Sequence, residues 1–193
     1  MFHSIPQSTL LTLALDTQHA WQAFPKESIH DLDNIRLSDL KPSAREKGVE
    51  AMFELSNIIV EGHARESRTG QPPRGLQLVL NDGSHPTNTL VMANLGYHQL
   101  KANPGLWRYS IRSGRSAEVF ELDEIEGKGA AGPTQDGQAQ QILLTTFEGV
   151  TIFPKFGRKA GMEEVDLLDD GPARPNADIK HKATELLSGF KHR

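Results

Sequence analysis

The sequence predicts an all-β fold, an antiparallel β-sandwich of about eight or nine strands with a flexible or short-helical C-terminal tail. Several short runs alternate apolar and polar residues, which is the period of a strand with one buried face. Turn signals containing Gly or Pro separate these runs. The chain of 193 residues is 37% hydrophobic and has no cysteine, so we expect a core that forms without disulfides.

The first third of the chain contains two predicted strands. Leu11, Leu13 and Leu15 alternate with more polar neighbours, as in a half-buried strand. Residues 49–61 fit both a strand and part of a helical period, and their β-branched residues favour a strand with a bulge near Asn57.

The middle of the chain contains the clearest strand signals. A turn-rich segment, 71–75, precedes the alternating run 76–81. Residues 107–111 alternate again, and Gly114 predicts a hairpin turn to a return strand at 119–122.

Four further segments complete the predicted sandwich. Residues 92–96 are apolar at successive positions, which is typical of a central strand covered on both faces. The Gly-rich segment 127–137 is predicted to be a mobile loop. Two strands, 141–147 and 150–153, are expected to flank a tight turn.

The composition changes after Gly161. An acidic cluster spans 163–170, where a calcium site or a basic partner is the alternative to a solvated linker. A Pro-containing segment follows, and apolar residues then recur on one face of a short helix at 179–190. We therefore predict a β-sandwich domain over residues 1–157 and an acidic, Pro-containing linker with a short helix over 158–193.

Charge and hydropathy exclude two classes of partner. The net charge of −4 gives no basic surface for nucleic acid. The apolar run 10–15 is far shorter than the roughly 20 residues that span a membrane, and it lacks the flanks of a signal peptide. We expect neither a nucleic acid nor a membrane as a partner.

Two polar motifs have competing interpretations. Asp31-Leu32-Asp33 matches the Asp-x-Asp metal motif of nucleotide-sugar transferases, but Asp is also a common turn former, and that structural interpretation is favoured. Glu61, His63 and Arg65 would share one strand face, as a binding strip or, more commonly, as a solvated sheet face.

No catalytic constellation is evident elsewhere. The eight histidines are scattered without metal-ligand spacing, and neither a nucleophile elbow nor a phosphate-binding loop is present. Four aromatic residues are candidates for a sugar-stacking platform, although their strand spacing favours the core: Trp21, Trp107, Tyr97 and Tyr109.

Longer blocks carry a family resemblance. The most specific are 69–77 (TGQPPRGLQ), 89–97 (TLVMANLGY) and 99–105 (QLKANPG), supported by shorter stretches at 6–8, 10–13, 31–35, 61–63, 114–118 and 161–164. Together they resemble the UDP-glucose:glycoprotein glucosyltransferases. His98 stands where that family usually has an aromatic residue, and residues 81–87 form a variable loop.

The resemblance implies a place and a role for this chain. In that family the matched blocks belong to the last β-sandwich ahead of the catalytic domain, so we expect a non-catalytic interdomain scaffold. The alternative is a module that binds misfolded glycoprotein clients or their glycans. UDP-glucose and calcium are expected only in the catalytic domain, which leaves this region with no catalytic, cofactor or metal residues.

The resemblance also implies partners and a compartment. The expected partners are neighbouring domains of the parent chain and misfolded N-glycoproteins, in the lumen of the endoplasmic reticulum. The candidate residues for contact with a domain or a client are Met92, Asn94, Tyr97, Pro72, Pro73 and Arg74.

Overall fold

The computed structural model describes residues 5–42, 48–135 and 137–169, and its described elements confirm the all-β class. Besides the 3-10 helix η1 (Leu37–Asp39) and the helix α2 (Arg115–Val119), these elements are strands. The strands are β1 Leu10–Leu11, β2 Trp21–Ser28, β3 Ile35–Arg36, β4 Ala51–His63, β5 Arg65–Glu66, β6 Gln77–Asn81, β7 Thr87–Leu90, β8 Tyr97–Ala102, β9 Gly105–Ile111, β10 Phe120–Gly127, β11 Ala130–Pro133, β12 Gln140–Leu144 and β13 Val150–Arg158.

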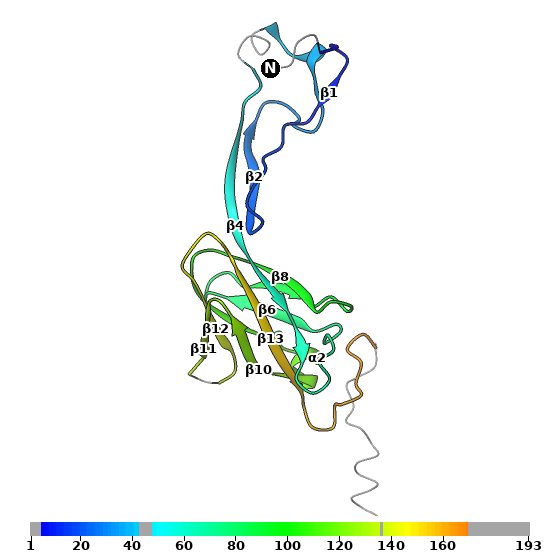
Figure 1. Cartoon of the computed structure of the whole chain (residues 1–193), viewed down its shortest axis with the longest axis vertical. Coiled ribbons are helices and arrows are strands. Elements are labelled where there is room, and N and C mark those ends of the chain that lie inside the picture. Colours follow the sequence, from blue (N-terminus) through cyan, green and yellow to red (C-terminus); the bar gives the residue numbers. More distant parts are fainter. Residues whose placement is uncertain (1–4, 43–47, 136, 170–193) are drawn as a thin grey trace, which may run out of the picture. The chain divides into compact units, whose positions relative to one another are not determined.

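The chain divides into two compact units, Met1–Ile58 and Ile59–Arg193, which we call the N-terminal unit and the sandwich unit. In the sandwich unit, one sheet has the order β11-β12-β9-β6-β7. The other has the order β10-β13-β4, with β5 paired to β13 and β8 paired to β4 (Figure 1). The sequence predicts an antiparallel sandwich, but the pairings of β13 with β4 and with β5 are parallel.

The core of the sandwich unit lies between these two sheets. Both sheets contribute fully buried side chains, among them Leu78 and Tyr109 from one sheet and Ile152 and Phe156 from the other. Side chains alternate across each strand, so the inward residues pack together and the outward residues meet solvent.

The N-terminal unit is built from two strand pairs. β1 pairs with β3, and residues 51–58 of β4 pair with β2 in antiparallel register (Figure 1). The register shifts between Gln22 and Ala23, so Ser56 has no Cα partner opposite it. This irregularity lies beside Asn57, where the sequence predicts a bulge.

Three local predictions about pairing were wrong. The strand predicted at 11–15 is limited to β1, Leu10–Leu11. Leu13 and Leu15 follow it with exposed side chains and belong to no strand. Gly114 is the N-cap of helix α2 and does not form a hairpin turn, and β9 and β10 belong to different sheets. Strands β12 and β13 also enter different sheets, so residues 148–149 do not close a hairpin.

Two further segments differ from their predictions. Residues 92–96 form a turn and not a central strand, and the apolar side chains of Met92 and Leu95 are exposed. Strand β11 lies within the predicted mobile loop 127–137 and pairs with β12. The structure has thirteen strands among its described residues, more than predicted, because several are only two to five residues long. The predicted helix at 179–190 lies outside the described residues.

Candidate functional site

The six candidate contact residues occupy two turns and the start of a strand. Met92 and Asn94 are exposed in the turn at 91–96, and Tyr97 begins β8 half-buried. The second turn precedes β6, where Pro72 is half-buried, Pro73 is buried and Arg74 is exposed. Pro73 therefore contributes to the structure of its turn, and the other five retain accessible surface.

The turn at 91–96 presents apolar side chains to solvent. Met92 is 47% exposed and Leu95 is 54% exposed. Hydrogen bonds close the turn from Met92 N to Tyr97 O (2.9 Å) and from Gly96 N to Met92 O (2.9 Å). Gly96 has φ +70°, and a Cβ atom there would lie 2.2 Å from Ala64 O, so only glycine fits. The turn is held rigidly although its apolar side chains are uncovered.

The segment Ala64–Glu66 is hydrogen-bonded to both turns. Ala64 N donates to Gly96 O (2.8 Å), and the Arg65 guanidinium donates to Leu95 O (3.0 Å). On the other side, Glu66 N donates to Gln71 O (2.8 Å). The two turns that carry the candidate residues are thus fixed to the same short stretch of backbone.

The predicted strip of Glu61, His63 and Arg65 is divided between two environments. Glu61 Oε1 accepts a hydrogen bond from the Tyr97 hydroxyl (2.8 Å), and the His63 ring lies 5.4 Å from the Tyr97 ring. Burial, followed by the hydrogen bond to Glu61, raises the pKa of Tyr97. Phe153 stacks on the His63 ring at 5.9 Å. Arg65 instead contacts the turn at 91–96.

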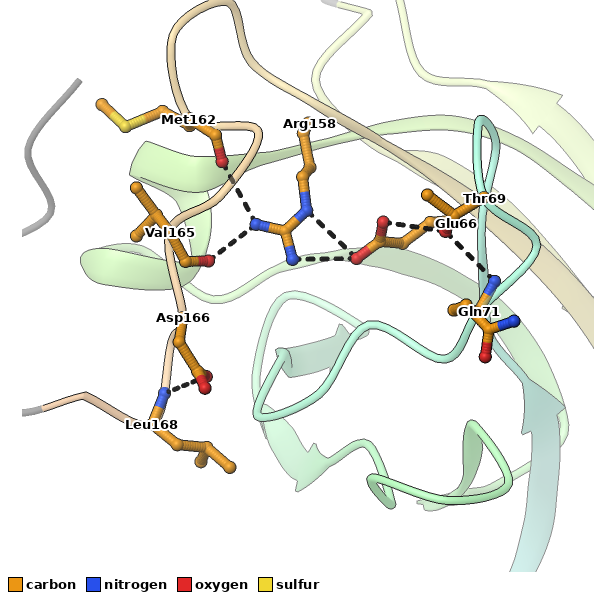
Figure 2. Close-up of polar contacts among 8 residues, drawn as sticks. All are labelled: Glu66, Thr69, Gln71, Arg158, Met162, Val165, Asp166 and Leu168. Carbon is orange, nitrogen blue, oxygen red and sulfur yellow. Dashed lines mark hydrogen bonds and ion pairs between the residues drawn. The ribbon is translucent and has the colours of Figure 1, made fainter. Parts of the chain in front are cut away.

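A second cluster anchors the segment after β13. Figure 2 shows Arg158 lying between Glu66 and two backbone carbonyls of this segment. Its Nε and Nη2 atoms donate to Glu66 Oε1 at 3.1 and 2.9 Å. Its Nη1 atom donates to Met162 O (3.1 Å) and Val165 O (2.6 Å). We call Glu66 and Arg158 with these two carbonyls the Arg158 clamp.

The Arg158 clamp is shielded from water. The side chains of Arg158 and Glu66 are 20% and 10% exposed, and the guanidinium carbon lies 4.6 Å from the centre of the Phe120 ring. Thr69 Oγ1 donates to Glu66 Oε2 (3.1 Å), which occupies the second carboxylate oxygen. A charged pair with several hydrogen bonds in a partly buried site is strongly directional.

Apolar packing also holds the segment 159–169 against the core of the sandwich unit. Met162, Val165 and Leu167 pack against the core of the sandwich unit. Gly75 has φ +75°, and a Cβ atom there would lie 2.8 Å from the Leu168 side chain. Arg115 also donates to Asp166 O (2.7 Å). The segment is therefore held at its start, its middle and its end.

Two carboxylates of the acidic cluster, those of Glu163 and Asp166, accept local hydrogen bonds. Glu163 Oε1 accepts from Gly161 N (3.2 Å), and backbone hydrogen bonds, with help from nearby Arg68 and Arg158, lower the pKa of Glu163. Asp166 Oδ1 accepts from Leu168 N (3.0 Å). Asp170 lies outside the described residues.

The Asp-x-Asp motif forms a turn in the N-terminal unit. Asp31 Oδ1 accepts from Asp33 N (3.2 Å), and Asp31 Oδ2 accepts from Asn34 Nδ2 (3.1 Å). The first of these is the hydrogen bond of an Asx turn, and the second adds a side-chain contact, so the carboxylate of Asp31 has the structural role that the sequence favours.

The aromatic candidates do not form one platform. Tyr109 is fully buried and hydrogen-bonded to His98 Nε2 (2.9 Å), and Trp107 is buried with its Nε1 donating to Asn103 O (2.8 Å). Burial lowers the pKa of His98 to about 4, so the imidazole is a neutral core residue. Of the four, Tyr97 meets the surface of the sandwich unit, and Trp21 belongs to the N-terminal unit.

An open groove of about 540 Å³ lies at one end of the five-stranded sheet. Asn81, Asp82, Arg108 and Gln141 contribute polar atoms to it, beside Leu106. Hydrogen bonds from the backbone of His85 and Ser84 lower the pKa of Asp82 to about 2. The carboxylate of Asp82 thus accepts hydrogen bonds from the backbone of its own loop. The residues that line the groove do not include a nucleophile beside a general base.

The Arg158 clamp is a feature that the sequence patterns did not predict, although a signal is present. Arg158 comes after Ile152, Pro154 and Phe156 at two-residue intervals, which places it in the inward phase of β13. A charged residue in the inward phase requires an opposite charge or carbonyl oxygens nearby. The sequence alone does not indicate that Glu66, 92 positions away, is that partner.

Two features are absent from the described residues. Across residues 5–42, 48–135 and 137–169, no three His, Asp or Glu side chains converge in a way that could hold a metal ion. None of the helices that the structure describes has the length and apolar character needed to cross a membrane.

Comparison with known proteins identifies the family. The model of the family described as UDP-glucose:Glycoprotein Glucosyltransferase matches residues 61–169. The UDP-glucose:glycoprotein glucosyltransferase of Drosophila melanogaster is 38% identical over 171 residues, which cover 88% of this chain and 11% of that protein. UDP-glucose:glycoprotein glucosyltransferase 1 of Homo sapiens is 40% identical over 172 residues, which cover 88% of this chain and 10% of that protein.

A third relative matches over a shorter stretch. The probable UDP-glucose:glycoprotein glucosyltransferase A of Dictyostelium discoideum is 44% identical over 122 residues, which cover 61% of this chain and 7% of that protein. The chain thus spans 7–11% of the length of these relatives. The family model covers more than half of the chain, and the chain therefore belongs to the UDP-glucose:glycoprotein glucosyltransferase family.

Proposed function

We propose that this chain is a non-catalytic β-sandwich module that acts as an interdomain scaffold within a UDP-glucose-dependent glucosyltransferase. The parent protein transfers glucose to the N-glycans of misfolded glycoproteins as part of quality control in the endoplasmic reticulum lumen. UDP-glucose and calcium bind in its catalytic domain, outside this chain.

The Arg158 clamp is the observation that supports the scaffold role. It ties the backbone at Met162 and Val165 to Glu66 of β5, through an ion pair that is largely shielded from water. A flexible connection would leave these carbonyls to solvent. The clamp instead sets the direction in which the chain leaves the sandwich unit, which is the property a scaffold needs to position the next domain of the polypeptide.

The first experiment tests the non-catalytic part of the proposal. The 193-residue chain is incubated with labelled UDP-glucose, calcium and a misfolded glycoprotein, with the full-length parent protein as positive control. We expect no transfer of label by the chain alone. Turnover above the blank would show that the chain itself is catalytic.

The second experiment tests the positioning role in the full-length parent protein. Arg158→Met removes the charge and all four of its hydrogen bonds while keeping a side chain of similar length. We expect transfer to a misfolded glycoprotein to fall several-fold, because the catalytic domain is no longer held in a fixed orientation relative to the sandwich unit. Transfer to a small free glycan should stay unchanged, since that acceptor needs only the catalytic domain.

A matched control comes from the same strand. Lys155 of β13 forms two exposed ion pairs, with Glu124 and Glu126, and both partners belong to β10 and not to the segment 159–169. Lys155→Met should therefore leave both activities unchanged. Equal losses from Arg158→Met and Lys155→Met, or an unchanged Arg158→Met protein, would contradict the positioning role.

A second candidate function, direct binding of misfolded clients, is favoured by the rigid apolar turn at 91–96. Its Met92 and Leu95 side chains are about half exposed, and Leu90 just before it is 53% exposed. Exposed apolar side chains on a rigid frame can bind the apolar segments that an unfolded protein displays. This function places the contact on the candidate residues Met92, Asn94 and Tyr97.

NMR titration distinguishes the two functions. An unfolded glycoprotein is added to the labelled 193-residue chain, and amide shifts are followed. Client binding predicts shifts confined to residues 90–97 that disappear in Leu95→Ser, with Leu143→Ser as the control on another exposed leucine. The absence of localised shifts at high client concentration would reject this second function.

A further inference from the structure

The open groove on the five-stranded sheet has a floor of three polar side chains in one row. Arg108 of β9 is the Cα partner of Asn81 on β6 and of Gln141 on β12. Cα partners on neighbouring strands present their side chains to the same face, and such strands lie about 4.8 Å apart. Trp107 and Tyr109, on either side of Arg108, are buried in the core, so the row faces outward. We call these three side chains the polar row, which is about 10 Å long.

Two loops and an exposed leucine complete this groove of about 540 Å³. Residues 82–83 line it after β6, and residues 134–135 line it after β11. Leu106 lies on the same face of β9 as the polar row and is 53% exposed, next to its Cα partner Leu143. The groove thus combines polar groups with an apolar ledge, and its volume lies within the roughly 300–1,000 Å³ that is typical of small-molecule sites.

Hydrogen bonds inside the loop after β6 leave polar atoms that can meet a ligand. Asn81 Oδ1 accepts from Gly83 N (2.8 Å), so the amide nitrogen is the donor that Asn81 offers. The bonds to Asp82 from Ser84 N (2.9 Å), Ser84 Oγ (3.1 Å) and His85 N (2.8 Å) all reach Oδ1. The other oxygen of this carboxylate, Oδ2, is therefore a further acceptor at the edge of the groove.

The groups that line the groove suit a neutral ligand with many hydroxyls. The carboxamides of Asn81, Gln135 and Gln141 can each donate and accept a hydrogen bond, as a sugar hydroxyl does. Among the described residues that line the groove, Asp82 is the one acidic side chain and Arg108 the one basic side chain. A phosphate or a carboxylate would meet Asp82 as well as Arg108, and this disfavours an anion.

The position of the groove disfavours an extended peptide. The strands β6, β9 and β12 each have a paired neighbour on both sides, in the order β11-β12-β9-β6-β7. A peptide that adds to a sheet needs an unpaired strand edge. Among the described residues that line the groove, the large apolar side chains are those of Leu106 and the buried Trp107, which is little for the alternate side chains of a peptide. A sugar ring needs only one apolar ledge for its C–H groups.

We propose that this groove binds a short, neutral oligosaccharide, whose hydroxyls form hydrogen bonds with the polar row while one ring packs on Leu106. The proposal goes beyond both functions proposed above and stands independently of them. Neither the Arg158 clamp nor the turn at 91–96 contributes a described residue to the lining of the groove.

NMR titration of the labelled 193-residue chain tests the proposal. The probes are mannotriose, maltotriose and triacetylchitotriose, which are neutral and differ in the stereochemistry and substitution of their rings. Inorganic phosphate and an unstructured apolar peptide represent the two disfavoured chemistries. We expect at least one of the three sugars to produce saturable shifts of the amides at 81–83, 106–108 and 141, and of the Trp107 indole N–H.

Two variants and a matched control identify the contacts. Gln141→Ala should weaken the binding of that sugar about five-fold, the loss expected for one hydrogen bond. Leu106→Ser should also weaken it several-fold, since it removes the apolar ledge. Gln77→Ala is the control, because Gln77 is an exposed glutamine of the same sheet that does not line the groove, and its affinity should equal that of the original chain. Unchanged amide shifts away from each substitution verify that the variants are folded.

Several results would overturn the proposal. One is the absence of saturable shifts with all three sugars, and another is saturation of the groove by phosphate or by the peptide without binding of a sugar. Equal affinities of Gln141→Ala, Leu106→Ser and the original chain would have the same consequence. Sugar-dependent shifts confined to residues 90–97 would place the ligand on the turn at 91–96 and reject the groove. None of these results changes the outcome expected for Arg158→Met, which tests the scaffold role separately.

Discussion

The N-terminal unit and the sandwich unit are both made of β-strands, yet they bury apolar side chains to very different extents. Among the described residues, eighteen buried hydrophobic residues lie in the sandwich unit and three lie in the N-terminal unit. The described part of each unit nevertheless has eight exposed large hydrophobic residues. Strand pairing alone therefore does not make a core, since a second layer must cover one face of the paired strands.

The two units differ in how completely their apolar side chains are enclosed. The sandwich unit contains both of its layers and fixes its own turns, as the hydrogen bond from Ala64 N to Gly96 O shows. The hairpin of β2 and β4 in the N-terminal unit leaves Phe24 and Met52 exposed at 52% and 56%. We expect mutations to be costly where side chains are enclosed and to have small effects where side chains stay in contact with water.

The largest expected effect is the loss of a core ring. Phe156 is fully buried between the sheets of the sandwich unit. Phe156→Ala should lower the free energy of unfolding by about 3–5 kcal/mol, because apolar transfer energy is lost and a cavity remains. Urea denaturation of the 193-residue chain measures this change. A cost below about 1 kcal/mol, the range of surface sites, would contradict the contrast between the units.

The buried histidine predicts a pH dependence that belongs to the sandwich unit. Burial lowers the pKa of His98 to about 4, whereas an unfolded chain has a histidine pKa of 6.5. Below pH 6.5 the unfolded state takes up a proton that the folded state does not. Stability should therefore be full above pH 6.5 and should fall between pH 6.5 and about 4, by roughly 3 kcal/mol in all.

Denaturation curves at several pH values check this dependence. His98→Phe should flatten the slope between pH 6.5 and 4, whatever its effect on stability at neutral pH. The control is His85→Phe, which alters an exposed histidine and should leave the slope unchanged. The same slope in His98→Phe and the original chain would show that another group carries the pH dependence.

Sequence patterns predict which residues face inward better than they predict which strands pair. The alternation in 107–111 locates β9 and its buried Trp107 and Tyr109. The same alternation does not indicate which strands pair with each other. The glycine at 114 therefore predicts a hairpin, although β9 and β10 lie in different sheets. Pairing depends on contacts between distant segments, which a local pattern does not encode.

The turn at 91–96 shows a second limit. Its residues are as apolar as a central strand, and apolar content alone predicts burial. The positive φ of Gly96 and the close approach to Ala64 O instead bend the chain and leave Met92 and Leu95 exposed. The six candidate contact residues rest on the family resemblance, and their role in binding stays a prediction.

A smaller effect is expected from the Arg158 clamp, which lies at the rim of the core. Arg158→Met leaves Glu66 and two carbonyls without their donor in a partly buried site. The free energy of unfolding should fall by about 1.5–3 kcal/mol, the range for hydrogen bonds to charged groups. Thermal denaturation measures it, and proteolysis should become faster within residues 159–169. Unchanged proteolysis would mean that apolar packing alone holds this segment.

The smallest effect is expected in the hairpin, where the contrast between the units is sharpest. Phe24 of β2 and Phe156 of β13 are the same residue type in strands of the same chain, but Phe24 is 52% exposed and Phe156 is fully buried. Phe24→Ala in the 193-residue chain should cost less than about 1 kcal/mol, because about half of the side chain stays in contact with water in the folded state. Urea denaturation measures this change alongside that of Phe156→Ala. A cost for Phe24→Ala as large as the cost for Phe156→Ala would contradict the contrast between the two units.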